Sequence, residues 1–274
     1  MIFRRINPIK NLLFYQSVRF FKWTDLPNLP KFNYIKDDDS YLYPHATYQV
    51  DDIKTVNYFH YRPKNIRDFI TYALIVSSKK IVDTLTLFKP ETASEKAFII
   101  RFIILELLAS VPGLQGGYIR HLLTLLCPKR DLGFIHTLIE EAENERMHLL
   151  FFTALHSPSM PLKVIGTFVQ YFFSILYGLC YLVFPRACHR FVGYLEEKAV
   201  LTYSQALNNI DSKKGSLSHW AEKPAVQIGI SYYKLNKNAT MRDLILAIRA
   251  DEVIHREVNH YIASQSMNEP NKLS

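Results

Sequence analysis

The chain has 274 residues, of which 49% are hydrophobic and 14% aromatic, and it carries a formal net charge of +8. This content is sufficient for the core of one large domain, and nine glycines with few alternating apolar stretches argue against an all-β fold. The three cysteines are odd in number and lie in apolar segments of helical character, so we expect buried thiols rather than a disulfide framework. They are Cys127, Cys180 and Cys188.

Residues 1–23 hold five basic side chains and no acidic one, mixed with bulky apolar residues. This composition, without an uninterrupted secretory core, is typical of a mitochondrial presequence, and a basic amphipathic helix lying on a membrane is the alternative. The leader accounts for +5 of the +8, so only +3 remains for the rest of the chain, where no basic patch interleaved with aromatic residues is left. We therefore expect no nucleic-acid binding.

Prolines recur between residues 24 and 65 and predict an irregular N-terminal arm. From Ile66 onward apolar residues recur at helical spacing, which predicts a helical domain over 66–266 followed by a tail over 267–274. A polar loop is expected over 211–239. The helices expected in the domain span 66–88, 92–126 with a bend near Pro112, 131–156, 163–186, 186–210 and, with Thr240 as its N-cap, 240–263.

The segment between Lys163 and Arg186 has no charged residue and is long enough to cross a membrane by hydropathy alone. Gln170, Ser174 and several tyrosines make it less apolar than a typical spanning helix. From this segment by itself, a spanning helix and a half-buried one both stay open.

Two Glu-x-x-His steps, Glu145–His148 and Glu252–His255, lie in separate predicted helices. Residues i and i+3 share a helix face, so each step can direct a carboxylate and an imidazole at one metal ion. Two such helices and one inward Glu from each of two others form the di-iron centre of a four-helix bundle. Glu106 and Glu196 are the candidates for the two further carboxylates.

Satisfied buried ion pairs are the alternative interpretation of these residues, because a buried carboxylate is costly unless it is paired or bound to metal. A third step, Glu257–His260, lies about 140° further round its helix than the second, so we expect it to face solvent or a helix end. Asn144 and Asp251 each precede a candidate ligand and are expected either to orient ligands from behind or to lie on the helix surface. Four carboxylates and two imidazoles suit two iron or manganese ions.

Four stretches of the chain resemble the alternative oxidases, the cyanide-insensitive ubiquinol oxidases of mitochondria. They read LELLASVPGLQGGYIRHL, KRDLGFIHTLIEEAENERMHLL, PRACHRFVGYLEEKAV and ATMRDLILAIRADEVIHREVNH, and the similarity begins near Pro63. The resemblance implies a ferritin-like four-helix bundle with a di-iron carboxylate centre and two additional long helices. The segments 66–88 and 161–185 would dip into one leaflet of the mitochondrial inner membrane, or that of a mitochondrion-derived organelle, as a monotopic anchor.

By the same resemblance, the ligands of two iron ions are Glu106, Glu145, His148, Glu196, Glu252 and His255. Tyr203 takes part in the oxidation chemistry. The ubiquinol pocket is implied at Asp83, Arg101, Leu105, Lys198, Ala199 and Thr202. His121 and Arg146 match positions at a homodimer interface.

Two residues depart from the family pattern near the implied quinol pocket. Lys198 stands in LEEKA where the family has LEEEA, and Lys79 stands where the family usually has Arg, which keeps the charge but loses the planar fork. No cysteine precedes Cys127, so regulation by an N-terminal cysteine is not expected.

The function expected from the sequence is ubiquinol oxidation coupled to reduction of O₂ to water, without proton pumping, by a divergent member of the family. A di-iron quinone-pathway hydroxylase is one alternative. A non-catalytic membrane-bound metalloprotein that has lost turnover through Lys198 is another.

Overall fold

The computed structural model describes residues 48, 53–56, 59–267 and 270–271. Within these residues it is all-helical, with one isolated bridge between Pro224 and Thr240 and no strand. The prediction of an all-α fold is therefore confirmed. The predicted leader, most of the predicted arm and most of the predicted tail lie outside the described residues.

Every predicted long helix is present, with ends shifted by a few residues. The elements are α3 (Ile66–Thr86), α4 (Glu95–Leu126), α5 (Phe134–Leu155), α6 (Met160–Val183), α7 (Pro185–Asp211), the 3₁₀ turn η3 (Ser218–Ala221), α8 (Gln227–Tyr233) and α9 (Met241–Ser264).

Side-chain caps explain where three of these helices begin. The side chains of Asn65 and Ser94 accept hydrogen bonds from backbone N–H groups at the starts of α3 and α4. Thr240 forms a reciprocal capping box with Asp243 at the start of α9, as predicted. By contrast, Pro112 lies inside α4, and the helix continues through it as one element.

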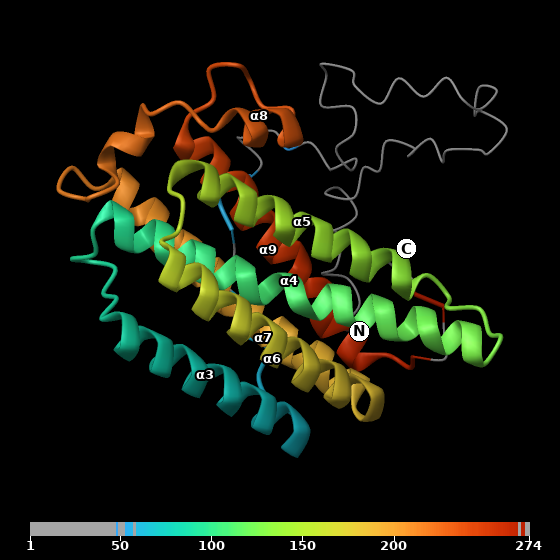
Figure 1. The fold of residues 1–274 in the computed structure, drawn as a ribbon. Coiled ribbons are helices and arrows are strands. Elements are labelled where there is room, and N and C mark those ends of the chain that lie inside the picture. Colours follow the sequence, from blue (N-terminus) through green and yellow to red (C-terminus); the bar gives the residue numbers. More distant parts are fainter. Residues whose placement is uncertain (1–47, 49–52, 57–58, 268–269, 272–274) are drawn as a thin grey trace, which may run out of the picture.

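The helices α4, α5, α7 and α9 form a four-helix bundle, in which α4 packs on α5 and α7 packs on α9 (Figure 1). Gly113 permits the close approach of α4 to α5, because a Cβ there would lie 2.6 Å from the carbonyl oxygen of Leu138. Outside the bundle, α3 packs on α7 and α6 packs on α4. The apolar core includes stacked rings of Phe102 and Tyr203, whose centroids are 5.0 Å apart.

The prediction of a polar loop over 211–239 is wrong in part. The segment contains η3 and α8, and it buries Trp220, Tyr232 and Tyr233 against the bundle. A short aromatic helix of seven residues carries too little periodicity to be recognised in a polar stretch, and only its packing on α5 and α9 orders it.

The predicted burial of the cysteine side chains holds for only one residue. All three cysteines are free, but only Cys188 is buried, while Cys127 and Cys180 are exposed. The apolar surroundings that suggested burial of Cys180 belong to an outward helix face.

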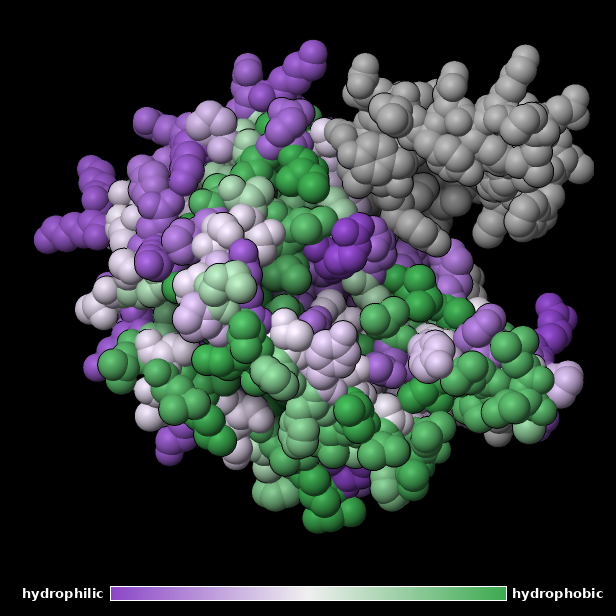
Figure 2. Space-filling view, in the orientation of Figure 1, coloured by the Kyte–Doolittle hydropathy of each residue, from purple (hydrophilic) through white to green (hydrophobic). Residues whose placement is uncertain are grey.

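That outward face is formed by α3 and α6, which leave large apolar side chains uncovered (Figure 2). Among the described helices, two are long and apolar enough to cross a membrane by length and composition: α4, whose apolar part is more than half buried, and α6, which is mostly exposed. Two polar residues of α6 contact α4: Gln170 donates to the carbonyl of Leu107, and Ser174 contacts Gln115. The exposed apolar residues of the two helices include Ile66, Phe69, Ile70, Leu74, Ile81, Leu85, Val164, Ile165, Phe168, Phe172, Ile175, Leu179 and Leu182.

Candidate metal centre

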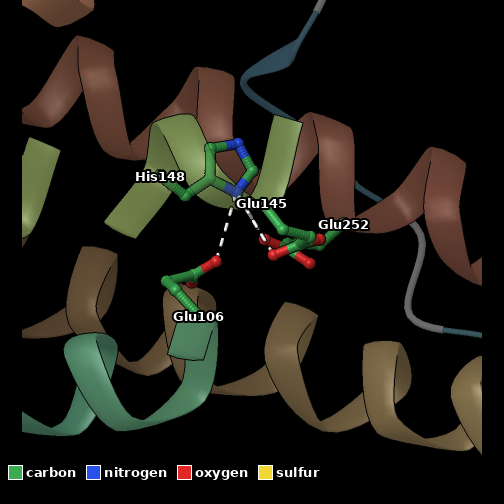
Figure 3. Close-up of side chains that lie close together, drawn as sticks. All are labelled: Glu106, Glu145, His148 and Glu252. Carbon is green, nitrogen blue, oxygen red and sulfur yellow. Dashed lines mark ion pairs between the residues drawn. The ribbon is translucent and has the colours of Figure 1, made fainter. Parts of the chain in front are cut away.

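The six residues predicted as ligands lie together at the centre of the bundle. Glu106 comes from α4, Glu145 and His148 from α5, Glu196 from α7, and Glu252 and His255 from α9. The four carboxylates are at most 1% exposed, His148 is fully buried and His255 is 7% exposed. Figure 3 shows four of them converging from three helices.

Nine side-chain atoms of this cluster are buried without a hydrogen-bond partner. They are the Nδ1 atoms of His148 and His255, Oε2 of Glu106, and both carboxylate oxygens of Glu145, Glu196 and Glu252. Buried polar atoms are rarely left unbonded in proteins, so nine of them facing one small volume indicate a cation-binding site. The donor set fits a metal centre of hard carboxylate oxygens with some imidazole nitrogen.

The donor atoms form two overlapping groups of four. Glu106, Glu145, His148 and Glu252 make one group, whose donor atoms lie within 4.8 Å of one another. The second group meets the same limit and consists of Glu145, Glu196, Glu252 and His255. Glu145 and Glu252 belong to both groups, so the two groups share two carboxylates.

The electrostatics of the cluster also favour a bound cation. The pKa values of Glu106 and Glu196 are raised by burial and by the neighbouring carboxylates of Glu145 and Glu252. Burial opposes the charge of His255, but the close contact with the charged Glu145, 2.7 Å away, outweighs it and raises the pKa of His255 to about 10. Without a cation these groups must hold protons, and a metal ion removes that need.

Asp251 and Asn144 stand behind His148 rather than on the helix surface, which decides between the two predicted alternatives. The Nε2 atom of His148 is 3.1 Å from Asp251, while Nδ1 faces the carboxylates. Asn144 donates to the same Asp251 carboxylate at 2.9 Å. A carboxylate behind a histidine fixes the ring orientation and the tautomer that a metal ligand requires.

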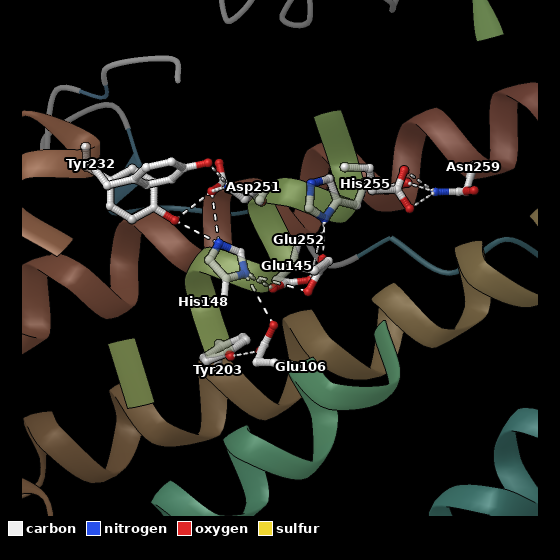
Figure 4. A network of polar contacts seen from close by, with 12 residues as sticks. Glu106, Glu145, His148, Tyr203, Tyr232, Asp251, Glu252, His255 and Asn259 are labelled. Atoms are coloured by element: carbon white, nitrogen blue, oxygen red, sulfur yellow. Dashed lines mark hydrogen bonds and ion pairs between the residues drawn. The ribbon is translucent and has the colours of Figure 1, made fainter. Parts of the chain in front are cut away.

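Three tyrosines complete this network and were not predicted. Tyr233 donates to Asp251 at 2.6 Å and lies 2.8 Å from Nε2 of His148, Tyr48 also contacts Asp251, and Tyr232 accepts from Asn144 (Figure 4). No local spacing signal links residues so distant in sequence, so only the tertiary structure could reveal them.

Tyr203 reaches the centre from α7. Its side chain is fully buried and its hydroxyl donates to Glu106 (Figure 4). Residues 196 and 203 are two turns apart on α7 and therefore share one helix face.

The prediction for Glu257 and His260 is wrong for His260. Its side chain is 5% exposed and contacts Arg190 and Glu197, on the side of α7 away from the metal cluster. Glu257 does lie at the surface, paired with Arg256. The helical angle correctly separated His260 from the cluster, but it could not show that Tyr61 and α7 cover that second face.

The residues implied in the quinol pocket are only partly brought together. Asp83 forms an ion pair with Arg101 at 2.8 Å and contacts Lys79. Asp83 and Lys79 line a surface groove at the end of α3.

The remaining implied pocket residues do not line that groove. Ala199 is buried, Leu105 is partly buried against the apolar core, and Thr202 donates to the carbonyl oxygen of Lys198 at 2.8 Å. Lys198 is half-buried, with its ammonium 5.4 Å from the ring centre of Tyr72. The two residues implied at a dimer interface, His121 and Arg146, are on the surface.

The fold and the site together define a four-helix-bundle protein with a carboxylate–histidine metal centre. Residues 48–264 match the model of the family described as "Alternative oxidase". The chain is 39% identical over 249 residues to the mitochondrial alternative oxidase of Emericella nidulans, covering 87% of this chain and 69% of that protein.

Two further relatives agree. The mitochondrial alternative oxidase of Trypanosoma brucei brucei is 41% identical over 79% of this chain and 65% of its own length, and that of Blumeria graminis is 42% identical over 83% and 68%. The chain therefore belongs to the alternative oxidase family.

Proposed function

We propose that this chain is a ubiquinol oxidase that couples the oxidation of two quinols to the reduction of one O₂ to two waters, at a pair of iron ions. The observation that carries the proposal is the pair of overlapping donor groups that share Glu145 and Glu252. Membership of the alternative oxidase family supports the reaction class.

Glu106, Glu145, His148, Glu196, Glu252 and His255 are the proposed iron ligands. Iron bound there would supply one-electron redox chemistry and open positions for dioxygen. Asp251 holds the ring of His148 with its Nδ1 towards the cluster. The apolar packing around these residues excludes water from the reaction.

Tyr203 is proposed as the residue that supplies an electron and a proton during O–O cleavage. Its hydroxyl already donates to a ligand carboxylate, Glu106, so its proton has an acceptor in contact. Burial and the charge of Glu106 raise its pKa, which keeps the phenol protonated until that step.

The proposed quinol pocket lies between α3, α4 and α7, near Asp83, Arg101, Leu105, Lys198, Ala199 and Thr202. The Asp83–Arg101 pair offers an acceptor and donors to a quinol headgroup. Lys198 adds a positive charge where the family has a carboxylate, so we expect it to alter quinol affinity and inhibitor response rather than oxygen chemistry.

We propose that α3 and α6 anchor the protein to one leaflet of the mitochondrial inner membrane, or of a mitochondrion-derived organelle. The apolar side chains that they leave exposed support this location, as do relatives named as mitochondrial. A homodimer formed through the surface that carries His121 and Arg146 completes the proposal.

Oxygen uptake by the purified, iron-loaded protein tests the function. Uptake that requires a quinol and persists in cyanide is the expected result. A quinone-pathway hydroxylase would instead consume oxygen while adding a hydroxyl group to its quinone-type substrate, and a non-catalytic metalloprotein would bind iron without uptake. Either outcome would refute the proposed reaction.

A further inference from the structure

A second buried polar network lies at the His255 end of the metal centre. Its four members come from four different helices and are each at most 5% exposed: Tyr181 of α6, His189 of α7, Asn259 of α9 and Glu141 of α5. Nothing in the proposed reaction uses these residues. Buried polar networks are costly unless every member is bonded, so their presence in the core requires a reason.

The donor and the acceptor of each hydrogen bond in this network can be assigned, starting from Glu141. The carboxylate of Glu141 can only accept, and Nδ2 of Asn259 donates to both of its oxygens, at 3.0 and 2.9 Å. The Asn259 amide oxygen must then face Nδ1 of His189, 2.9 Å away, which must carry the hydrogen. Nε2 of His189 is therefore the acceptor for the hydroxyl of Tyr181 at 3.0 Å.

The last bond of the network connects two helices that do not pack closely. Among the described helices, α4 packs on α5 and α7 packs on α9, while side chains span the space between α5 and α9. Glu141 precedes Glu145 by one turn of α5, and Asn259 follows His255 by one turn of α9. The Glu141–Asn259 bond thus crosses the bundle one turn away from the Glu145–His255 contact, which measures 2.7 Å.

Asn259 is also tied directly to a proposed ligand. Its Nδ2 donates to the backbone carbonyl of His255 at 3.0 Å, so the side chain that reaches Glu141 also holds the turn of α9 that carries the imidazole (Figure 4). At the opposite end of the centre, the Asn144–Asp251 bond spans the same two helices beside His148.

We infer that Glu141 and Asn259 form an inter-helix clamp that sets the spacing of α5 and α9 at the His255 end of the centre, and that they are positioning residues for the metal position made by Glu145, Glu196, Glu252 and His255. His189 and Tyr181 hold the Asn259 amide in the orientation that the clamp requires. This role rests on the proposed two-metal site, because His255 belongs to only one of the two donor groups.

Three isosteric variants test the clamp. Asn259→Asp replaces the donor by a carboxylate that faces Glu141, and it should separate the helices at this end. Glu141→Gln removes the charge but keeps the shape. In the double variant, the amide introduced by Glu141→Gln can donate to the new carboxylate, which still accepts from His189. The contact between α5 and α9 is then restored with reversed polarity, while the bond from residue 259 to the His255 carbonyl stays lost.

Titration of the full-length apoprotein with Fe²⁺ or Co²⁺ is the first measurement. The parent should bind two ions. Asn259→Asp should bind one of them at least about tenfold more weakly and leave the other within a few-fold of the parent, and the double variant should recover part of that loss. Equal weakening of both ions, parental binding by Asn259→Asp, or no recovery in the double variant would overturn the inference.

Thermal unfolding of the apoprotein is the second measurement and does not depend on metal. Asn259→Asp should lower the unfolding midpoint by roughly 5–10 °C, with recovery in the double variant. A parent that binds no metal would refute the two-metal site, whereas additive effects of the two substitutions on the midpoint would refute the clamp.

Asp68→Asn is the matched control. Asp68 is a fully buried acid bonded to Arg190, and it lies outside the clamp. Its loss should lower the unfolding midpoint while both ions still bind as in the parent. Selective loss of one ion in this control would mean that general destabilisation explains the clamp variants.

Discussion

Asp251 lies 3.1 Å from Nε2 of His148, although the two residues are 103 positions apart. The contact joins the helix that carries one Glu-x-x-His step to the residue preceding the other step. Because Nε2 faces Asp251, Nδ1 is left to face the carboxylates, where Glu252 and Glu106 lie 3.2 and 3.3 Å away. Asp251 of α9 therefore orients an imidazole of α5, and Asn144 of α5 in turn bonds Asp251.

Replacing Asp251 by Asn should weaken metal binding at the position that includes His148. The amide cannot provide the negative charge that raises the basicity of the ring, so we expect a loss of affinity of about 10–100-fold for one ion. Calorimetric metal titration measures this, with Glu257→Gln as a surface control that keeps parental binding. Unchanged affinity in Asp251→Asn would contradict the assigned orientation.

Replacing a carboxylate that belongs to both donor groups by alanine should remove more metal than replacing a carboxylate that belongs to only one group. Glu145 and Glu252 belong to both donor groups, so Glu145→Ala or Glu252→Ala should lose both ions and all oxygen uptake. Glu106→Ala and Glu196→Ala should each primarily lose one ion. Metal analysis of the four purified variants measures the difference, and full activity in either shared-ligand variant would refute the two-metal assignment.

Lys198→Glu, which restores the family pattern, should leave iron content unchanged. Lys198 is two residues beyond Glu196 and points about 200° away from it on the helix, next to Tyr72. We expect a changed KM for quinol or a changed potency of quinol-site inhibitors, because the charge acts on the headgroup or on groups beside it. Lys213→Glu, at an exposed position, is the control. Kinetics identical to the parent would show that Lys198 has no part in the pocket.

The proposed anchoring by α3 and α6 predicts that both ends of α6 lie on the same side of the membrane. If α3 and α6 lie in one leaflet, then Lys163 and Arg186, which flank the apolar segment of α6, stay on the same side of the membrane. Cysteine labelling at both positions in sealed vesicles should give equal accessibility. Labelling of the two positions from opposite sides would mean that α6 spans the membrane.

His189 should make stability depend on pH. Burial lowers its pKa from the ordinary 6.5 to about 4, so the folded protein holds it neutral while the unfolded chain protonates it. Stability is therefore greatest above pH 6.5 and falls as the pH drops through the window from 6.5 to about 4, by up to about 3 kcal/mol from this group.

Unfolding of the parent and of His189→Gln, measured between pH 7 and pH 4, isolates this contribution. The stability difference between the two should shrink as the pH falls. A constant difference over the window would contradict the neutral, buried assignment.

Helical periodicity and the Glu-x-x-His spacing determined the number of long helices, the capping of α9 by Thr240 and the six candidate ligands. These features are local, because residues three or four apart share a helix face whatever surrounds the helix. The same rule could have pointed to Glu141 and Asn259, each four residues from a candidate ligand.

Only the tertiary structure decided what stands behind the ligands. Tyr233 reaches His148 from a short helix that packing alone orders, and His260 is buried because Tyr61 and α7 cover a face that its own helix leaves free. Likewise, only the tertiary structure shows that Gln170 and Ser174, within the apolar segment of α6, contact α4. Burial and contacts between helices depend on which helices pack together. A local sequence pattern does not show this, because segments distant in sequence come together only when the whole chain folds.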